Sequence, residues 1–210
     1  MDIKTKIIDG AGELFTRYGV RSVSMDDIAR QLSISKKTIY QYFKDKDEIV
    51  TKAVKARIDF EKEEYDEIFG SSHDAVEELS KVCKCIRKDF HEMNPSLLFD
   101  LQKYHPQAWK VWLDFKNEHM RDSIVTNLKR GIEEGYFRKE IDPEFMAILR
   151  VEQVQLAFDN LVFPSDKFNL KETQMKLLDH YVHGIVTEKG RKLYMKYQEK
   201  EKTLNQTSNN

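Results

Sequence analysis

Apolar side chains recur every three to four residues over most of the chain, which is the spacing of one face of an α-helix. Residues 3–18 form one clean stripe of this kind, and Gly19 follows it as a stop signal. The period continues through 46–69, 73–92 and 95–103, and, after a break at 104–106, to about residue 134. It then returns in 143–163 and 169–186, with a further short helix over 188–198. The pattern predicts an all-α fold whose helices bury their apolar stripes against one another.

Two short helices are predicted between residues 24 and 43. Ser24 is suited to cap the first helix and Ser35 to cap the second. In the second helix the apolar positions share one face, while Lys37 and Gln41 point to the opposite face. Each helix is too short to persist alone in water, so the neighbouring helices must hold the pair as a unit. The arrangement is typical of a helix-turn-helix, whose second helix enters the DNA major groove.

Composition and charge agree with this picture only locally. The 210 residues contain 35 basic and 36 acidic side chains, so the net charge does not indicate nucleic-acid binding. Between Arg30 and Lys46, however, five basic residues accompany the single acid Asp45. No secretory signal and no apolar run long enough to span a bilayer is visible, so we expect a cytoplasmic protein without a membrane partner.

Residues 3 to about 50 resemble the N-terminal domain of the TetR family of bacterial transcriptional regulators. The matching residues are Leu14, Phe15, Gly19, Ile28, Ala29, Ser35, Thr38, Tyr40, Tyr42, Phe43 and Lys46. Two positions depart from the family pattern: Ser33 stands where the turn often has Gly, which suggests a different turn, and Lys37 stands where a small residue is usual. The resemblance implies a three-helix DNA-binding head over 1–46 and a helical bundle for ligand binding and dimerisation over 47–200. For the tail, 201–210, we expect disorder.

The candidate DNA-binding residues lie in and around the helix-turn-helix. Lys37 and Gln41 point outward and can reach base edges, Lys to guanine and Gln to adenine. The resemblance implies phosphate contacts for Tyr40 and Tyr42, and a phosphate clamp by Lys46 at the start of the long helix. For each residue the alternative is an ordinary solvated side chain. The full predicted set is Ser24, Lys36, Lys37, Thr38, Tyr40, Gln41, Tyr42 and Lys46.

The second domain is rich in aromatic side chains at helical spacing. Such stripes are more often core than ligand site, but the family resemblance places a ligand cavity in this region. A helical bundle with large aromatic residues can enclose a small apolar or cationic molecule. The predicted pocket residues are Phe90, Phe99, Tyr104, Trp109, Trp112, Phe115 and Phe158.

The last two long helices, 143–163 and 169–186, carry apolar residues on more than one side, which favours packing on two sides. The resemblance implies that these helices form a four-helix bundle across a two-fold axis, where Gly184 would allow close approach. The alternative is that both helices are central in a monomer core. The predicted interface residues are Leu149, Leu156, Leu178, Tyr181, Gly184 and Ile185.

Other chemistry is weakly supported by the sequence. His180 and His183 lie one helical turn apart, but no Cys or third His stands at ligand spacing nearby, so we expect neither a metal nor a cofactor. The acidic run 61–67 is interpreted as a solvated helix face. Cys83 and Cys85 are interpreted as small core or surface residues, with a redox switch as the alternative.

Together these features predict a ligand-responsive repressor that binds a palindromic operator as a homodimer and is not an enzyme. Two alternatives stay open. One is a regulator controlled by a protein partner without a small-molecule effector. The other is a helical enzyme acting on a small molecule, which the absence of a nucleophile-base or metal constellation disfavours.

Overall fold

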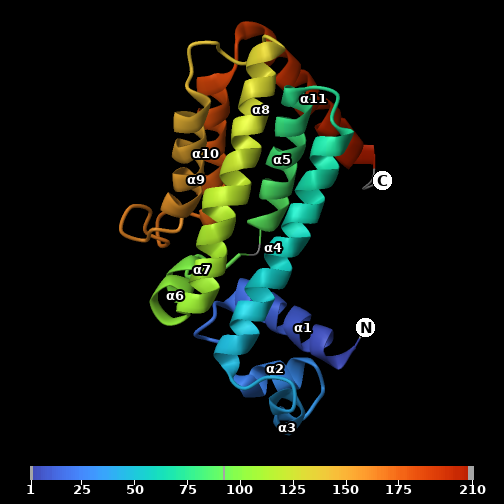
Figure 1. Cartoon of the computed structure of the whole chain (residues 1–210), viewed down its shortest axis with the longest axis vertical. Helices are drawn as coiled ribbons and strands as arrows, with labels where there is room; N and C mark the ends of the chain where they lie inside the picture. Colours follow the sequence, from blue (N-terminus) through green and yellow to red (C-terminus); the bar gives the residue numbers. More distant parts are fainter. Residues whose placement is uncertain (1, 92, 208–210) are drawn as a thin grey trace.

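The computed structural model describes residues 2–91 and 93–207, and these residues form an elongated all-helical molecule (Figure 1). The first four helices run in the order α1 (Ile3–Tyr18), α2 (Met25–Gln31), α3 (Lys36–Tyr40) and α4 (Lys46–Ser71). They are followed by α5 (Ala75–Asp89), α6 (Leu97–Tyr104), α7 (Pro106–Asp114), the π-helical segment η1 (Phe115–Met120), α8 (Arg121–Glu133), α9 (Pro143–Leu156), α10 (Leu170–Ile185) and α11 (Glu188–Thr207).

The head, formed by α1, α2, α3 and the first turns of α4, lies at one end of the molecule (Figure 1). Its helices begin where the sequence supplies side-chain caps. Ser24 forms a capping box with Asp27, and the Ser35 hydroxyl accepts a hydrogen bond from the Thr38 amide at 3.0 Å. The apolar stripes of the four helices meet in one core that contains the fully or almost fully buried side chains of Ile7, Ala11, Phe15, Ile28, Ile39, Phe43 and Ile49.

Gly10 has a packing role that the periodicity alone did not indicate. A Cβ atom at Gly10 would lie 2.7 Å from Cδ2 of Leu32, at the end of α2. The missing side chain therefore lets α1 and α2 approach closely, which offsets the low helix propensity of glycine.

The long helix α4 extends from the head into a second group of helices, α5 and α8–α11 (Figure 1). The core of this bundle includes Val76, Leu79, Leu128, Phe137, Val182 and Ile185. Between Glu133 and Pro143 the chain makes an isolated antiparallel bridge from Phe137 to Val186. The predicted division into 1–46 and 47–200 stays a prediction. Ile49, Val50 and Ala53, which lie after the predicted boundary, pack in the same core as the head.

Three polar contacts join the head to the segment 93–105. The Arg21 amide donates to the Asp100 carboxylate at 3.2 Å, and the Asn94 amide donates to the Thr16 carbonyl at 2.7 Å. His105 Nδ1 lies 2.7 Å from the Asp47 carboxylate on α4. The head is thus tied to α6 and the start of α7 by contacts that a shift of either helix would disturb.

Several predicted helix boundaries are corrected by the structure. α9 ends at Leu156 rather than near residue 163, because the side chains of Asp159 and Asn160 accept hydrogen bonds from the amides of Leu161 and Ser165 and favour a turn. α4 continues past Gly70 to Ser71. α11 runs through Thr207 into the segment where we expected disorder, in keeping with its many Lys, Glu and Gln residues. Residues 208–210 lie outside the described residues.

Within the described part of the chain, none of the helices combines the length and the apolar character needed to cross a lipid bilayer.

Candidate functional site

α3 ends at Tyr40, so Gln41, Tyr42 and Phe43 lie in the turn after it and not in the helix that the sequence predicted. Ile39 and Phe43 anchor this segment on its buried side. Ile39 is fully buried and Phe43 is 2% exposed, so both are fixed in the head core. Lys37 and Gln41 lie exposed on the opposite face, as the periodicity predicted. Tyr40 and Tyr42 are 49% and 42% exposed, so their hydroxyls are accessible beside Lys37 and Gln41. α3 lies at the end of the molecule (Figure 1). The exposed side chains of Lys37, Tyr40, Gln41 and Tyr42 therefore offer ammonium, amide and phenol groups to a ligand outside the chain.

Ser24, Lys36 and Thr38 already have partners within the head. The Ser24 hydroxyl lies 2.6 Å from the Asp27 carboxylate, and this bond holds the pKa of Asp27 below its ordinary value. The Lys36 ammonium donates to Asp26 at 2.8 Å, and the pKa of Lys36 is raised by that hydrogen bond. The Thr38 hydroxyl pairs with Ser35 Oγ at 2.7 Å. Their roles in DNA binding stay predictions.

Lys46 is placed differently from the expectation. Its ammonium donates to the Val20 carbonyl at 2.6 Å, and partial burial lowers the pKa of Lys46 from its ordinary value. The side chain therefore points into the head instead of outward from the start of α4. A phosphate clamp by this ammonium is not preformed in the structure, because the group would first have to leave Val20.

The turn between α2 and α3 is also corrected. Ser33 has a φ angle of 54°, in the left-handed region that Gly adopts at little cost. The expected different turn is not formed. The turn has the backbone conformation that suits glycine, and Ser33 adopts it.

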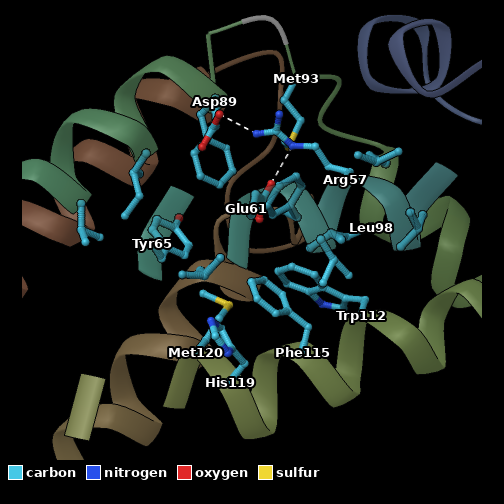
Figure 2. Close-up of a pocket in the computed structure, with 18 of the residues that line it drawn as sticks. Arg57, Glu61, Tyr65, Asp89, Met93, Leu98, Trp112, Phe115, His119 and Met120 are labelled. Atoms are coloured by element: carbon cyan, nitrogen blue, oxygen red, sulfur yellow. Dashed lines mark hydrogen bonds and ion pairs between the residues drawn. The ribbon is translucent and has the colours of Figure 1, made fainter. Parts of the chain in front are cut away.

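A cavity of about 210 Å³ lies between the head and the second group of helices. It is lined mainly by apolar side chains, and it extends from Phe15 of α1 to Tyr181 of α10. Four of the predicted pocket residues line it: Phe90, Trp112, Phe115 and Phe158. Figure 2 shows Trp112 and Phe115 on the wall opposite Arg57.

The other three predicted pocket residues do not line this cavity, and their role in ligand binding stays a prediction. Phe99 is half exposed, and the Lys103 ammonium lies 5.3 Å from its ring centre. Tyr104 lies under the guanidinium of Arg21 at 4.9 Å, at the contact between the head and α6. Trp109 packs against the core that the head shares with α6 and α7. Helical spacing placed these rings on helices but could not distinguish the side of α6 or α7 that faces the cavity.

One wall of the cavity carries a charged cluster that the sequence analysis missed. Arg57 donates to Glu61 at 2.7 Å and also to Asp89 (Figure 2). Burial raises the pKa of Glu61 to about 7, although Arg57 favours the ionised carboxylate. Burial likewise raises the pKa of Tyr65, which lines the same wall. The acidic run 61–67 is therefore not simply a solvated face, since Glu61 and Tyr65 turn inward.

The π-helical segment η1 interrupts what was predicted as one continuous helix. It places Phe115, His119 and Met120 along the cavity, and the rings of Phe115 and His119 stack with centres 5.6 Å apart. Burial lowers the pKa of His119, so the imidazole is neutral near pH 7. Local π-helical turns often occur at functional sites, because they change which side chains share a face.

Arg150 of α9 is the most unusual residue of the cavity wall. Its side chain lines the cavity, the residue is only 4% exposed, and neither of its terminal nitrogens has a hydrogen-bond partner among the described residues. A sequence signal existed for it. Arg150 shares a face with Ala147, Val151 and Val154, which are all buried, so a charged residue interrupts an apolar stripe.

The predicted interface residues separate into two groups. Leu178, Tyr181 and Ile185 are at most 4% exposed and pack within the core of the single chain, so their assignment to a subunit interface is corrected. Leu149 and Leu156 are each 39% exposed on α9, and a Cβ atom at Gly184 would meet nothing within 4 Å. The interface role of Leu149, Leu156 and Gly184 stays a prediction.

The two cysteines are poorly placed for thiol chemistry. Cys83 is buried, and burial raises the pKa of the Cys85 thiol to about 11, which disfavours the reactive thiolate. Across the described residues, no group of three or more His, Cys, Asp or Glu side chains is arranged to hold a metal ion.

The head is similar to known proteins in sequence, and the whole chain is similar in fold. The family model described as "Bacterial regulatory proteins, tetR family" matches residues 7–53. The transcriptional repressor KstR2 of Mycobacterium tuberculosis is 24% identical over 144 residues, which are 67% of this chain and 72% of the relative.

Two solved structures extend the likeness. A TetR-family regulator from Agrobacterium tumefaciens has a TM-score of 0.71 at 19% identity and covers 88% of this chain and 97% of its own. A transcriptional regulator from Saccharomonospora viridis in complex with choline has a TM-score of 0.72 at 19% identity, over 88% and 98% of the two chains. At this identity the likeness shows a shared fold.

Proposed function

Since the chain belongs to the TetR family of helix-turn-helix transcriptional regulators, we propose that it is a repressor that binds a palindromic operator as a homodimer. In this proposal a small molecule bound in the cavity changes the affinity of the protein for DNA. α3 is the recognition helix and enters the major groove. The observation that carries the proposal is the exposed set of Lys37, Tyr40, Gln41 and Tyr42 on α3 and the turn that follows it, on the side away from buried Ile39.

The roles of the α3 residues follow from their positions. Lys37 and Gln41 reach base edges, because they lie exposed on the face away from the head core. Tyr40 and Tyr42 contact phosphates through their hydroxyls, which position the head without selecting sequence. Lys46 contributes less than the family resemblance implied, since its ammonium is engaged by Val20.

A homodimer is supported by an apolar stripe on α9. Phe145 is 63% exposed and Ile148 is 46% exposed, and Leu149 and Leu156 extend the same face. Such a stripe is costly to leave in water, and a second copy of the helix across a two-fold axis would cover it. The dimer also supplies two recognition helices, which a palindromic site requires about 34–36 Å apart.

Ligand response is supported by the reach of the cavity. The same cavity touches Phe15 on α1 and Val50 and Ala53 on α4, the two helices that carry the helix-turn-helix. A ligand that fits only one arrangement of these helices would favour that arrangement in both subunits. The head also contacts α6 and the start of α7 directly, through Asp100 and His105.

DNA recognition can be tested with operator sites selected from a random DNA pool by the full-length protein. We expect Gln41→Ala to change which sequences are selected, whereas Tyr42→Phe weakens binding to all selected sequences by a similar factor. Lys176→Ala, an exposed cation on α10, is the matched control and leaves both properties unchanged. Unaltered sequence preference in Gln41→Ala would exclude the base contact assigned to Gln41.

Dimerisation can be tested with Leu149→Glu. A carboxylate in the α9 stripe should separate the subunits in sedimentation experiments and abolish tight operator binding. Leu161→Glu is the control, because Leu161 is 93% exposed in the loop after α9 and lies outside the stripe. A Leu149→Glu variant that stays dimeric would place the interface elsewhere.

The two alternative functions have less support. A regulator controlled only by a protein partner is expected to have a solid core around Trp109 and Trp112, whereas Trp112 lines a cavity. The similar proteins are transcriptional regulators, which gives an enzymatic role no support from homology.

A further inference from the structure

The cavity wall carries buried hydrogen-bond donors that have no acceptor. Trp112 Nε1, both terminal nitrogens of Arg150 and the Tyr181 hydroxyl are all buried without a partner among the described residues. All three residues line the cavity. The indole and guanidinium groups can only donate hydrogen bonds, so the wall requires acceptors. Buried polar atoms in proteins are almost always satisfied, and an unsatisfied group therefore requires an explanation.

No carboxylate is among the titratable groups that act most strongly on the guanidinium of Arg150. These groups are Cys83, Tyr181 and Tyr65. Burial raises the pKa of both phenols, so both are neutral near pH 7. Burial also lowers the pKa of Arg150, but a guanidinium stays protonated at neutral pH. An uncompensated buried charge costs free energy that the folded protein recovers only when an anion arrives.

Two other cations of the bundle have carboxylate partners, although Arg57, with 42% of its side-chain surface exposed, is not buried. Lys116, on the same side of the bundle, is also 4% exposed, and its ammonium donates to Glu152 and Gln155 at 2.8 Å each. Arg57 is paired with Glu61 and Asp89. Arg150 is thus an exception within its own surroundings, which points to a role outside the fold itself.

The carboxylates that line the cavity are already in use. Glu61 and Asp89 accept from Arg57, and Glu78 accepts from Asn127 at 2.8 Å and from Arg130 at 3.3 Å. Each of these carboxylates would have to give up a hydrogen bond to pair with Arg150. Nε2 of His119, which also lines the cavity, is a further buried polar atom without a partner among the described residues. A ligand in the cavity can supply the acceptor that Arg150 lacks.

We propose that the cavity binds a small molecule with an apolar body and a carboxylate, and that Arg150 pairs with this carboxylate while the body packs against Trp112, Phe115 and Phe158. The guanidinium suits two parallel hydrogen bonds to a carboxylate, and Tyr181 can donate a further one. This chemistry replaces the apolar or cationic effector that the aromatic residues alone suggested. A role of this ligand as an effector rests on the proposed function, whereas the binding of the ligand does not.

The proposal is tested by ligand binding to the purified full-length protein in the absence of DNA. The probes are decanoate, decanol and decylammonium, which share one apolar chain and differ in the charge of the head group. Binding is measured by calorimetry and by the fluorescence of the two tryptophans, since Trp112 lines the cavity. We expect decanoate to bind at least tenfold more tightly than decanol and decylammonium to bind least, because a hydrogen-bonded ion pair is worth about tenfold or more.

Substitutions at Arg150 assign the preference to this residue. Arg150→Met keeps the length and apolar packing of the side chain, and it should reduce the affinity for decanoate to that for decanol. It should also raise the thermal midpoint of the free protein, because the unpaired charge is gone. Arg150→Lys should retain part of the preference for decanoate. Lys116→Met removes a buried positive charge outside the cavity lining and should leave the preference unchanged.

Each outcome decides between the proposal and its rivals. Equal binding of the three probes, preference for decylammonium, no binding of decanoate, or an unchanged preference in Arg150→Met would overturn the proposal. Preferential binding of decanoate that depends on Arg150 supports it, whatever the DNA experiment shows. If such binding leaves affinity for the selected operator unaltered, the ligand-responsive function fails while the carboxylate site stands.

Discussion

Glu61 provides a test of how the cavity affects stability. The carboxylate lies on the cavity wall beside Arg57, and burial raises its pKa to about 7 from an ordinary value of 4.5. We consider the substitution Glu61→Gln, which removes the titration but keeps a side chain that can accept the hydrogen bond from Arg57. Asp89 remains as the ionised partner of Arg57.

The sign of the effect follows from proton binding. Between pH 4.5 and about 7 the folded protein holds the Glu61 proton more tightly than the unfolded chain does. The contribution of Glu61 to stability is therefore greatest below about pH 4.5 and is lost as pH rises through about 7. A pKa difference from 4.5 to about 7 corresponds to about 3 kcal/mol. This is an upper limit, because 16% of the side-chain surface still meets solvent.

Urea unfolding of the wild type and of Glu61→Gln, followed by circular dichroism from about pH 5 to about pH 8, measures the effect. We expect similar free energies of unfolding near pH 5, and near pH 8 a variant that is more stable than the wild type by about 1 to 3 kcal/mol. Glu63→Gln is the control, because Glu63 is exposed on the same helix. Parallel pH profiles of wild type and Glu61→Gln would refute the raised pKa.

Three further outcomes are expected from single positions. Gly131→Ala should lower the free energy of unfolding by about 2 kcal/mol or more in urea titrations, because its Cβ would lie 2.0 Å from the buried ring of Phe137; an unchanged midpoint would show that the ring has room to move. Ser33→Gly should raise the free energy of unfolding by up to about 1 kcal/mol in the same assay, because φ at this residue is 54°. A less stable variant would contradict this expectation. Cys85, with a thiol pKa of about 11, should react with iodoacetamide at about pH 8 roughly a hundredfold more slowly than a free cysteine peptide. Peptide mass spectrometry of the alkylated native protein measures this rate. A rate like that of the free peptide would restore the redox alternative.

The sequence alone determined where the helices of the head begin and which of their faces is buried, although α3 ends at Tyr40 and not at Phe43. Ser24 and Ser35 cap their helices through hydrogen bonds to groups three residues away, and Ile39 and Phe43 lie on the buried face that their spacing predicted. These features depend on side chains that are close along the chain. Local helix geometry fixes which atoms such side chains can reach, so the sequence is sufficient.

The environment of the cavity was decided only by tertiary structure. Arg57 joins residues 61 and 89 from two helices, and the partners of Arg150 depend on what α4, α5 and α10 place around it. Helical spacing selected Trp112 and Trp109 alike, although only Trp112 lines the cavity. Spacing defines one face of a helix, but a helix in a bundle has several neighbours, and the sequence does not state which neighbour lies opposite each face. Whether a buried charge has a partner is a property of that packing. The sequence shows Arg150 interrupting an apolar stripe, but only the folded chain shows that its guanidinium lacks an acceptor.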